Sequence, residues 1–248
     1  KGFALETSPL TARIGESTIR GTLHMNDFRK PEFICHVNSN LLRMADLGFT
    51  SPEGEVNLRR IKGQIALQDN TLHVYDLSFG LGKSIFKLSG NMRGFDEPKI
   101  TAELISPYID FDDAARLLAL EYAEKDDTDI PGMQVKANLR VDTGTFSGVE
   151  FKNLAAGVRY TPETVNVETF RADFFGGMGA AKGKAYFHPD EPNRYEAHIS
   201  ADGMSLEPIQ RFLGIVDRTI TGTLFLTGEI SATGDTAEEF KKTATGTF

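Results

Sequence analysis

The sequence is poor in cysteine. Cys35 is the only cysteine among 248 residues, so the chain forms no internal disulfide and no site with several cysteine ligands for zinc or an iron–sulfur cluster. Cys35 alternates with Phe33 and Val37. This pattern predicts a small apolar side chain on a strand in preference to a nucleophile.

Tryptophan is absent, and basic residues are outnumbered by acidic ones. The chain has 27 Lys and Arg against 35 Asp and Glu, a formal net charge of -8, which disfavours a nucleic-acid partner because phosphate binding requires clustered cations. No apolar run reaches the about 18 residues of a transmembrane helix, and no signal-peptide pattern is present. The chain starts at Lys1 without methionine and stops at Phe248 in what resembles the opening of a strand. We therefore expect it to be a segment of a longer protein.

Motifs for phosphate or dinucleotide binding are incomplete. The run from Gly80 to Ser84 resembles a phosphate loop, but Leu77 stands where that motif requires its first glycine, and a strand pattern follows instead of a helix. We interpret the run as a turn. The glycines of residues 174–179 lack the third glycine of a dinucleotide fingerprint, because Lys182 occupies its place.

Metal and catalytic patterns are also missing. Asp127 and Asp129 imitate a calcium loop, but Pro131 replaces a ligand and Asn138 replaces the closing glutamate. The carboxylates near Asp110 are better explained as helix caps, and no serine lies in a nucleophile elbow. The five histidines occur singly. We predict no catalytic residue, no metal and no cofactor, and hence a protein that is not an enzyme.

What the sequence does contain is alternation of apolar and polar residues. Residues 19–25, 99–104, 135–141 and 195–201 each place apolar side chains at every second position, which predicts strands with one dry face and one wet face. Antiparallel sheets tolerate this arrangement, whereas parallel sheets require continuous apolar runs. The predicted fold class is mainly β, with an elongated, curved antiparallel sheet that forms a groove, built from repeated hairpins with a few short amphipathic helices.

The pattern repeats along the chain. Three copies of a strand–strand–helix unit begin at Gly21, Gly90 and Gly183, and a fourth begins at Gly222. A further pair of hairpins, residues 64–88 and 155–181, also align with each other. The acidic stretch 124–129 is the clearest loop. We therefore divide the chain into two repeat segments, residues 1–125 and residues 126–248.

Two short helices are predicted to cover the sheet. Asp110 caps the first, which places Leu117 and Leu118 on one face. Ser205 caps the second, which carries its apolar residues at helical spacing. The residues predicted to cover the sheet are Leu117, Leu118, Ile209, Phe212 and Leu213.

Several stretches resemble one known family. Residues 148–160 followed by 165–179 form a linker strand, an apolar strand and a Gly-Gly turn, and residues 204–213, 220–234 and 238–246 complete a C-terminal pattern. These stretches are similar to the AsmA-like proteins of Gram-negative envelopes, which include AsmA and, more distantly, TamB. The resemblance covers most of the chain and is best from about Gln134 onward.

The resemblance implies a curved sheet folded into an apolar trough, in a periplasmic protein anchored in the inner membrane through a region outside this chain. Its expected partner is phospholipid or another acyl-chain ligand, carried towards the outer membrane, with envelope proteins as possible further partners. The side chains expected to line the groove are apolar residues of the alternating strands. They are Leu23, Met25, Phe33, Leu72, Val74, Phe79, Phe86, Leu88, Ile100, Leu104, Val135, Leu139, Val165, Val167, Phe170, Phe174, Ile199, Leu224 and Leu226.

Two other functions remain open from the sequence. One is a non-enzymatic scaffold or assembly factor for outer-membrane proteins, which would receive client strands at sheet edges. The other is a surface carbohydrate-binding or adhesin β domain, which would be expected to expose Trp or Tyr platforms. The absence of tryptophan makes this last function the weakest of the three.

Overall fold

A computed structural model describes residues 5–6, 10–25, 32–52, 54–122, 132–215 and 220–248. Strands make up 69% of the protein, all ladders are antiparallel, and the helices are short, so the predicted mainly β fold class is confirmed. The chain divides into two compact units, Lys1–Met133 and Gln134–Phe248. The predicted boundary at residues 125 and 126 lies outside the described residues, as do Asp127 and Asp129 of the acidic loop.

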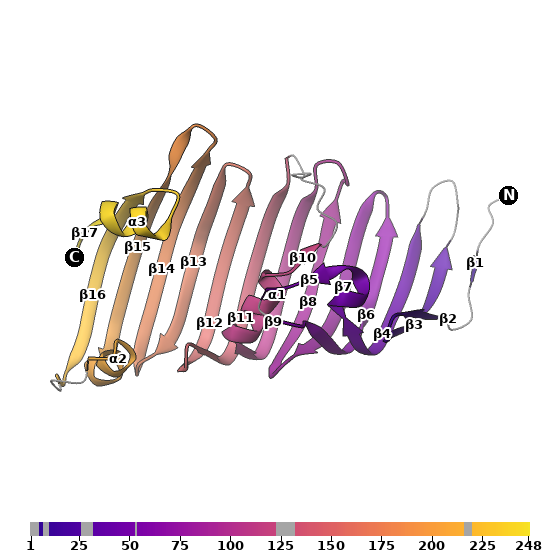
Figure 1. Ribbon diagram of the computed structural model, residues 1–248, viewed down its shortest axis with the longest axis horizontal. Helices are drawn as coiled ribbons and strands as arrows, with labels where there is room; N and C mark the ends of the chain where they lie inside the picture. Colours follow the sequence, from indigo (N-terminus) through magenta and orange to yellow (C-terminus); the bar gives the residue numbers. More distant parts are fainter. Residues whose placement is uncertain (1–4, 7–9, 26–31, 53, 123–131, 216–219) are drawn as a thin grey trace. The chain divides into compact units, whose positions relative to one another are not determined.

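Unit 1 is an open antiparallel sheet in which most strands pair with their neighbours in the sequence. Its strand order is β1-β3-β4-β6-β7-β8-β9, and β2 also pairs with β3 (Figure 1). The strands are β1 (Leu5–Glu6), β2 (Leu10–Ile14), β3 (Ser17–Met25), β4 (Phe33–Arg43), β6 (Asn57–Gln68), β7 (Thr71–Leu81), β8 (Ser84–Arg93) and β9 (Lys99–Asp110).

Two short connections of unit 1 form a cover, drawn in front of its strands in Figure 1. The first consists of the 3-10 helix η1 (Met44–Leu47) and β5 (Phe49–Thr50). The second consists of α1 (Phe111–Leu118) and β10 (Glu121–Tyr122). β5 and β10 pair antiparallel and so join the two connections. The predicted cap of α1 is confirmed, because the Asp112 N–H donates to the Asp110 carboxylate at 3.1 Å.

The strands of unit 2 pair in the order β11-β12-β13-β14-β15-β16-β17, and their ladders are antiparallel (Figure 1). Each strand therefore pairs with the strands before and after it in the sequence, as a series of hairpins requires. The strands are β11 (Gln134–Phe146), β12 (Val149–Thr161), β13 (Thr164–Phe174), β14 (Gly177–His188), β15 (Glu191–Ser205), β16 (Thr223–Thr233) and β17 (Thr245–Thr247).

The two helices of unit 2 lie at opposite ends of its strands (Figure 1). Helix α2 (Leu206–Phe212) follows β15, and α3 (Ala237–Thr243) follows β16. Thr236 and Glu239 form a capping box at the start of α3, which explains why this short helix begins there. The Phe240 ring of α3 contacts Tyr195 edge-on, with the ring centroids 5.4 Å apart.

Of the three residues predicted to cover the sheet from α2, Ile209 is half-buried, whereas Phe212 and Leu213 are exposed. The helix ends at Phe212, so Leu213 lies beyond it and is 62% exposed, and Phe212 is 46% exposed. The buried residue of the helix is Gln210, whose side-chain oxygen accepts the Ile220 N–H at 2.9 Å. Ser205 occupies the N-cap position without a side-chain capping bond. Helical spacing predicts an apolar inner face for this helix, but its one buried residue is the polar Gln210.

The glycines at which the three repeat copies begin lie so close to the neighbouring strand that a side chain would clash with it. A Cβ atom on Gly21 would lie 2.3 Å from the His36 carbonyl oxygen, and one on Gly90 would lie 2.2 Å from that of Thr101. Gly183 has the same relation to Glu196, at 2.7 Å. Adjacent strands therefore approach closely at the same point of each copy, which explains the glycines at which the copies begin.

Candidate functional site

One face of the unit 2 sheet is apolar from strand to strand. Directly paired residues of antiparallel strands share a face. One such row reads Ala137, Val158, Val167, Gly183, Ala197 and Ile230, and the adjacent row reads Leu139, Ala156, Phe170, Ala181, Ile199 and Gly228. Neither row contains a charged or polar side chain. We call this surface the apolar face of unit 2.

The predicted groove-lining residues of unit 2 belong to this face and are mostly half-buried. Val135 pairs with Tyr160, which pairs with Val165, and Ala201 pairs with Leu226. A half-buried state means that no second layer of protein fully covers these side chains within the described part of the chain. The half-buried members are Val135, Leu139, Val165, Val167, Phe170, Phe174, Ile199, Leu224 and Leu226.

The corresponding face of unit 1 is also apolar. Leu67, Leu72, Met92 and Ile100 form one row across β6 to β9. Phe86 is buried, the side chains of Leu23 and Met25 lie outside the described part of the structure, and the other predicted residues are half-buried. The half-buried residues are Phe33, Leu72, Val74, Phe79, Leu88, Ile100 and Leu104.

Burial on the apolar face of unit 2 is concentrated at one end of the strands. Leu154 on β12, Ala172 on β13 and Met204 on β15 are at most 5% exposed, and all lie toward the β13–β14 turn. Toward the other end, Tyr160 and Tyr195 are half-buried. We call these the closed end and the tyrosine end. Ala232 on β16 departs from the trend, because it is buried beside Tyr195 near α3.

Unit 1 shows the same gradient. Ile61, Leu81, Phe86 and Ile109 are buried at the end of the sheet that carries the β7–β8 turn, whereas Leu67, Leu72, Leu88 and Ile100, farther along the same face, are half-buried. The covering connections η1 and α1 reach this end, because both bond to serines beside the turns there. Of the predicted helix-cover residues in this unit, Leu117 is half-buried and the side chain of Leu118 lies outside the described structure.

The first of these attachments joins η1 to the β2–β3 turn. The Asp46 carboxylate accepts the Ser17 hydroxyl at 2.6 Å and the N–H groups of Ser17 and Glu16 at 2.9 and 3.1 Å. The Ser17 hydroxyl in turn accepts the Arg43 N–H at 2.9 Å. Gly15 has φ of +56°, and a Cβ there would lie 2.3 Å from the carboxylate, so glycine is required. This network anchors the cover to the sheet.

The second attachment repeats the first in α1. The Asp113 carboxylate accepts the Lys83 N–H at 2.9 Å and the Ser84 hydroxyl at 3.4 Å, and the Ser84 hydroxyl accepts the Asp110 N–H at 2.8 Å. The serine–aspartate separation is 29 residues in both networks. The interpretation of residues 80–84 as a turn is confirmed, since Gly82 and Lys83 link β7 to β8. In this turn the Lys83 N–H, which a phosphate loop would direct at a phosphate, donates to the Asp113 carboxylate.

The first network predicts a pH dependence of stability. The hydrogen bond from the Ser17 hydroxyl lowers the pKa of Asp46, and the Ser17 and Glu16 N–H groups and the Arg43 charge act in the same direction, against partial desolvation. A folded pKa below the unfolded value of about 3.9 gives stability that is fully present above that value and is lost as the pH falls through the folded pKa.

We therefore expect the stability difference between the parent chain and Asp46→Asn to be largest near pH 6 and to shrink toward pH 2. Urea unfolding followed by circular dichroism across this range measures the difference. Asp96→Asn, in an exposed turn, serves as the control and is expected to show a smaller pH-dependent difference. A gap for Asp46→Asn that stays constant down to pH 2 would contradict an ionised Asp46 in the network.

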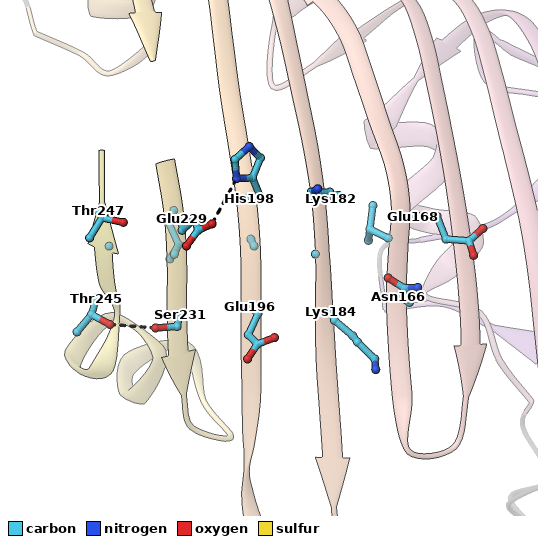
Figure 2. Close-up of a pocket in the computed structure, with 15 residues that line it drawn as sticks. Asn166, Glu168, Lys182, Lys184, Glu196, His198, Glu229, Ser231, Thr245 and Thr247 are labelled. Carbon is cyan, nitrogen blue, oxygen red and sulfur yellow. Dashed lines mark hydrogen bonds and ion pairs between the residues drawn. The ribbon is translucent and has the colours of Figure 1, made fainter. Parts of the chain in front are cut away.

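The opposite, polar face of unit 2 carries a shallow hollow of about 860 Å³ (Figure 2). Figure 2 shows Lys182 and Lys184 of β14 between the polar side chains of β13 and those of β15. Of the predicted groove residues, only Val167 borders this hollow. The remaining polar residues along its border are Asn166, Glu168, Glu196, His198, Glu229, Ser231, Thr245 and Thr247.

Several side chains around the hollow pair with a neighbouring side chain. Glu168 accepts from the Arg159 guanidinium at 2.8 and 3.1 Å, and the Ser231 and Thr245 hydroxyls are 3.0 Å apart. His198 Nδ1 lies 3.9 Å from the Glu229 carboxylate. Acidic and basic groups alternate across the strands instead of converging on one point. This arrangement stabilises strand pairing and offers no set of groups for proton transfer or nucleophilic attack.

Sequence reasoning missed the hollow and both serine–aspartate networks. For the hollow, the available signal was the charge alternation of neighbouring strands, such as Lys184 directly opposite Glu196. For the networks, the signal was the repeated spacing of Ser17 from Asp46 and of Ser84 from Asp113. Both signals become clear only when the strand register is known.

Metal sites and membrane helices can be assessed for the residues that the structure describes. Among them, no three or more His, Cys, Asp or Glu residues are grouped to hold a metal ion. None of the helices described here has the length and hydropathy needed to cross a membrane. In comparisons with known proteins, no family model, curated protein or solved structure matches the chain.

Proposed function

We propose that this protein carries phospholipid along its apolar faces, as the periplasmic part of an inner-membrane-anchored, AsmA-like envelope protein that serves the outer membrane. No residue performs chemistry in this function. The observation that carries the proposal is the apolar face of unit 2, which extends over β11 to β16 without a charged side chain in its two central rows and stays half-buried. The sequence resemblance supplies the class of cargo and the compartment.

The energetics of such a surface favour acyl chains as cargo. Moving one methylene group from water to an apolar surface contributes about 0.8 kcal/mol. Half-buried Leu139, Phe170 and Ile199 offer that surface on alternate strands of one row, with Ala156 and Ala181 between them. Lipid bound there would shield the same side chains from water, so the cargo and the sheet each gain from contact.

A second candidate, a scaffold that receives client strands, is favoured by the edge strand β16. β17 pairs only with Glu229, Ile230 and Ser231, so residues 223–228 have a strand partner only in β15 among the described residues. An added strand could extend the ladder there. Photocrosslinking from Thr227 separates the two functions in cells, because a scaffold would give protein adducts at this edge.

The lipid-carrying function is tested by the composition of the purified protein. We expect organic extraction of the chain, expressed in the bacterial periplasm and purified in mild detergent, to yield phospholipid in a reproducible ratio to protein. Native mass spectrometry would identify the adducts. A chain that repeatedly emerges free of lipid, and that takes none from vesicles, would overturn the proposal.

A further inference from the structure

The two ends of the apolar face in unit 2 differ in character. At the closed end, the face is lined by apolar side chains, of which Leu154, Ala172 and Met204 are buried. Phe175, in the turn that follows β13, contacts Phe212 of α2 with the ring centroids 5.9 Å apart. A charged headgroup placed there would lose its hydration at a cost of several kcal/mol.

The tyrosine end has the opposite properties. Tyr160 and Tyr195 project from the apolar face, and each is half-buried. A tyrosine combines an apolar ring with a hydroxyl that requires water or a polar partner, so it suits a boundary between hydrocarbon and water. The hairpin turns beyond these tyrosines carry exposed polar residues, which are Glu163, His188, Asp190 and Glu191.

The height of the face matches one lipid layer. From Val135 to Val141, β11 spans about 20 Å at a rise of roughly 3.4 Å per residue. The hydrocarbon core of a bilayer is about 30 Å thick, so the acyl chains of one leaflet occupy about 15 Å. An acyl chain laid parallel to the strands therefore fits between the tyrosine end and the closed end.

We infer that a phospholipid bound to unit 2 lies parallel to the strands, with its headgroup at the tyrosine end and its acyl chain ends toward Leu154 and Ala172. This inference rests on the lipid-carrying function proposed above and adds an orientation to it. A lipid in this orientation keeps its headgroup among hydrated turns. Successive strands from β11 to β14 then present similar positions, so the lipid moves sideways across them without turning over.

The absence of tryptophan provides the test. Single tryptophans are introduced as Tyr160→Trp at the tyrosine end and Phe174→Trp at the closed end, with Val165→Trp and Leu226→Trp as second probes in case either variant fails to fold. Thr169→Trp, at an exposed position, is the control. Each variant is loaded with phosphatidylcholine that carries a nitroxide quencher either on the headgroup or near the methyl end of one acyl chain.

Tyr160 pairs with Val165, which lies nine residues before Phe174 on β13, so the two probes are about 30 Å apart at roughly 3.4 Å per residue. We therefore expect the headgroup nitroxide to quench Tyr160→Trp about twofold more than Phe174→Trp, and the chain-end nitroxide to show the reverse order. The control should be quenched weakly by both lipids. Equal quenching at the two ends, or the opposite order, overturns the orientation and leaves the lipid-carrying function standing. Loss of quenching by both lipids at every apolar-face probe overturns both.

Discussion

The Ile199→Glu variant is expected to bind phospholipid about tenfold more weakly than the parent chain, or weaker still. Each 1.4 kcal/mol of lost binding free energy lowers the affinity tenfold. Ile199 lies in the middle of the apolar face, directly between Ala181 and Gly228. A carboxylate there must either lose its hydration against acyl chains or keep water on the face, and both outcomes cost several kcal/mol. Phe170→Glu, in the same row, is expected to act in the same direction.

The matched control is the neighbouring residue on the same strand. Ser200 follows Ile199 and pairs with Thr227, so its side chain faces the polar side of the sheet. Ser200→Glu adds the same charge to the same strand and should leave the lipid content close to that of the parent chain. Thr169→Glu is the corresponding control for Phe170→Glu. Circular dichroism and thermal unfolding establish that each variant is folded, and equal lipid content in Ile199→Glu and Ser200→Glu would contradict the proposed role of the apolar face.

The Asp113→Ala variant is expected to lower the free energy of unfolding by about 1–3 kcal/mol, because it leaves the Lys83 N–H without its acceptor and leaves the Ser84 hydroxyl only the Asp110 carbonyl oxygen. The Asp113 carboxylate is the acceptor for the Lys83 N–H and the Ser84 hydroxyl, and both Asp113 and Ser84 are buried. Its loss should also detach α1 from the β7–β8 turn. Urea unfolding followed by circular dichroism measures the change.

Asp112→Ala separates this effect from the general influence of a carboxylate at the start of a helix. Asp112 is exposed and lies in the same first turn of α1. Its removal should cost less than about 1 kcal/mol, the usual contribution of an acidic residue to the helix dipole. Asp113→Asn keeps an acceptor oxygen and should fall between the two alanine variants. Equal losses for Asp112→Ala and Asp113→Ala would show that the bonds to the turn contribute little.

The sequence predicted the two-faced strands well because strand periodicity is a local property. Alternation within a few residues is enough to assign Leu139 and Ile199 to the apolar side and Ser200 to the polar side. The burial at the closed end was not predictable in this way, since it involves contacts between segments far apart in the sequence, such as that of Phe175 with Phe212. Leu213 illustrates the limit of helical spacing, because α2 ends at Phe212 and Leu213 lies beyond the helix with an exposed side chain.

Distance along the chain explains what else was missed. Asp46 and Ser17 are far apart in sequence, and no local pattern indicates that one binds the other. The hollow on the polar face likewise depends on five strands, from β13 to β17, being placed in register. The repeat could have indicated the two serine–aspartate networks, because Ser17 and Asp46 recur as Ser84 and Asp113 with the same spacing in the next copy. Strand pairing had to be known before Lys184 and Glu196 could be recognised as neighbours.

The hairpin-by-hairpin pairing within each unit has a consequence for how the chain acquires its structure. Most of the described strands find a partner in the next strand along the sequence, so loop closure is short and each completed hairpin offers an edge on which the following strand can assemble. In unit 1, the β5–β10 ladder is different, because it closes a loop that contains β6 to α1. The sheet of unit 1 can therefore assemble progressively from its first strands, with the cover secured only after β9 and α1 are in place.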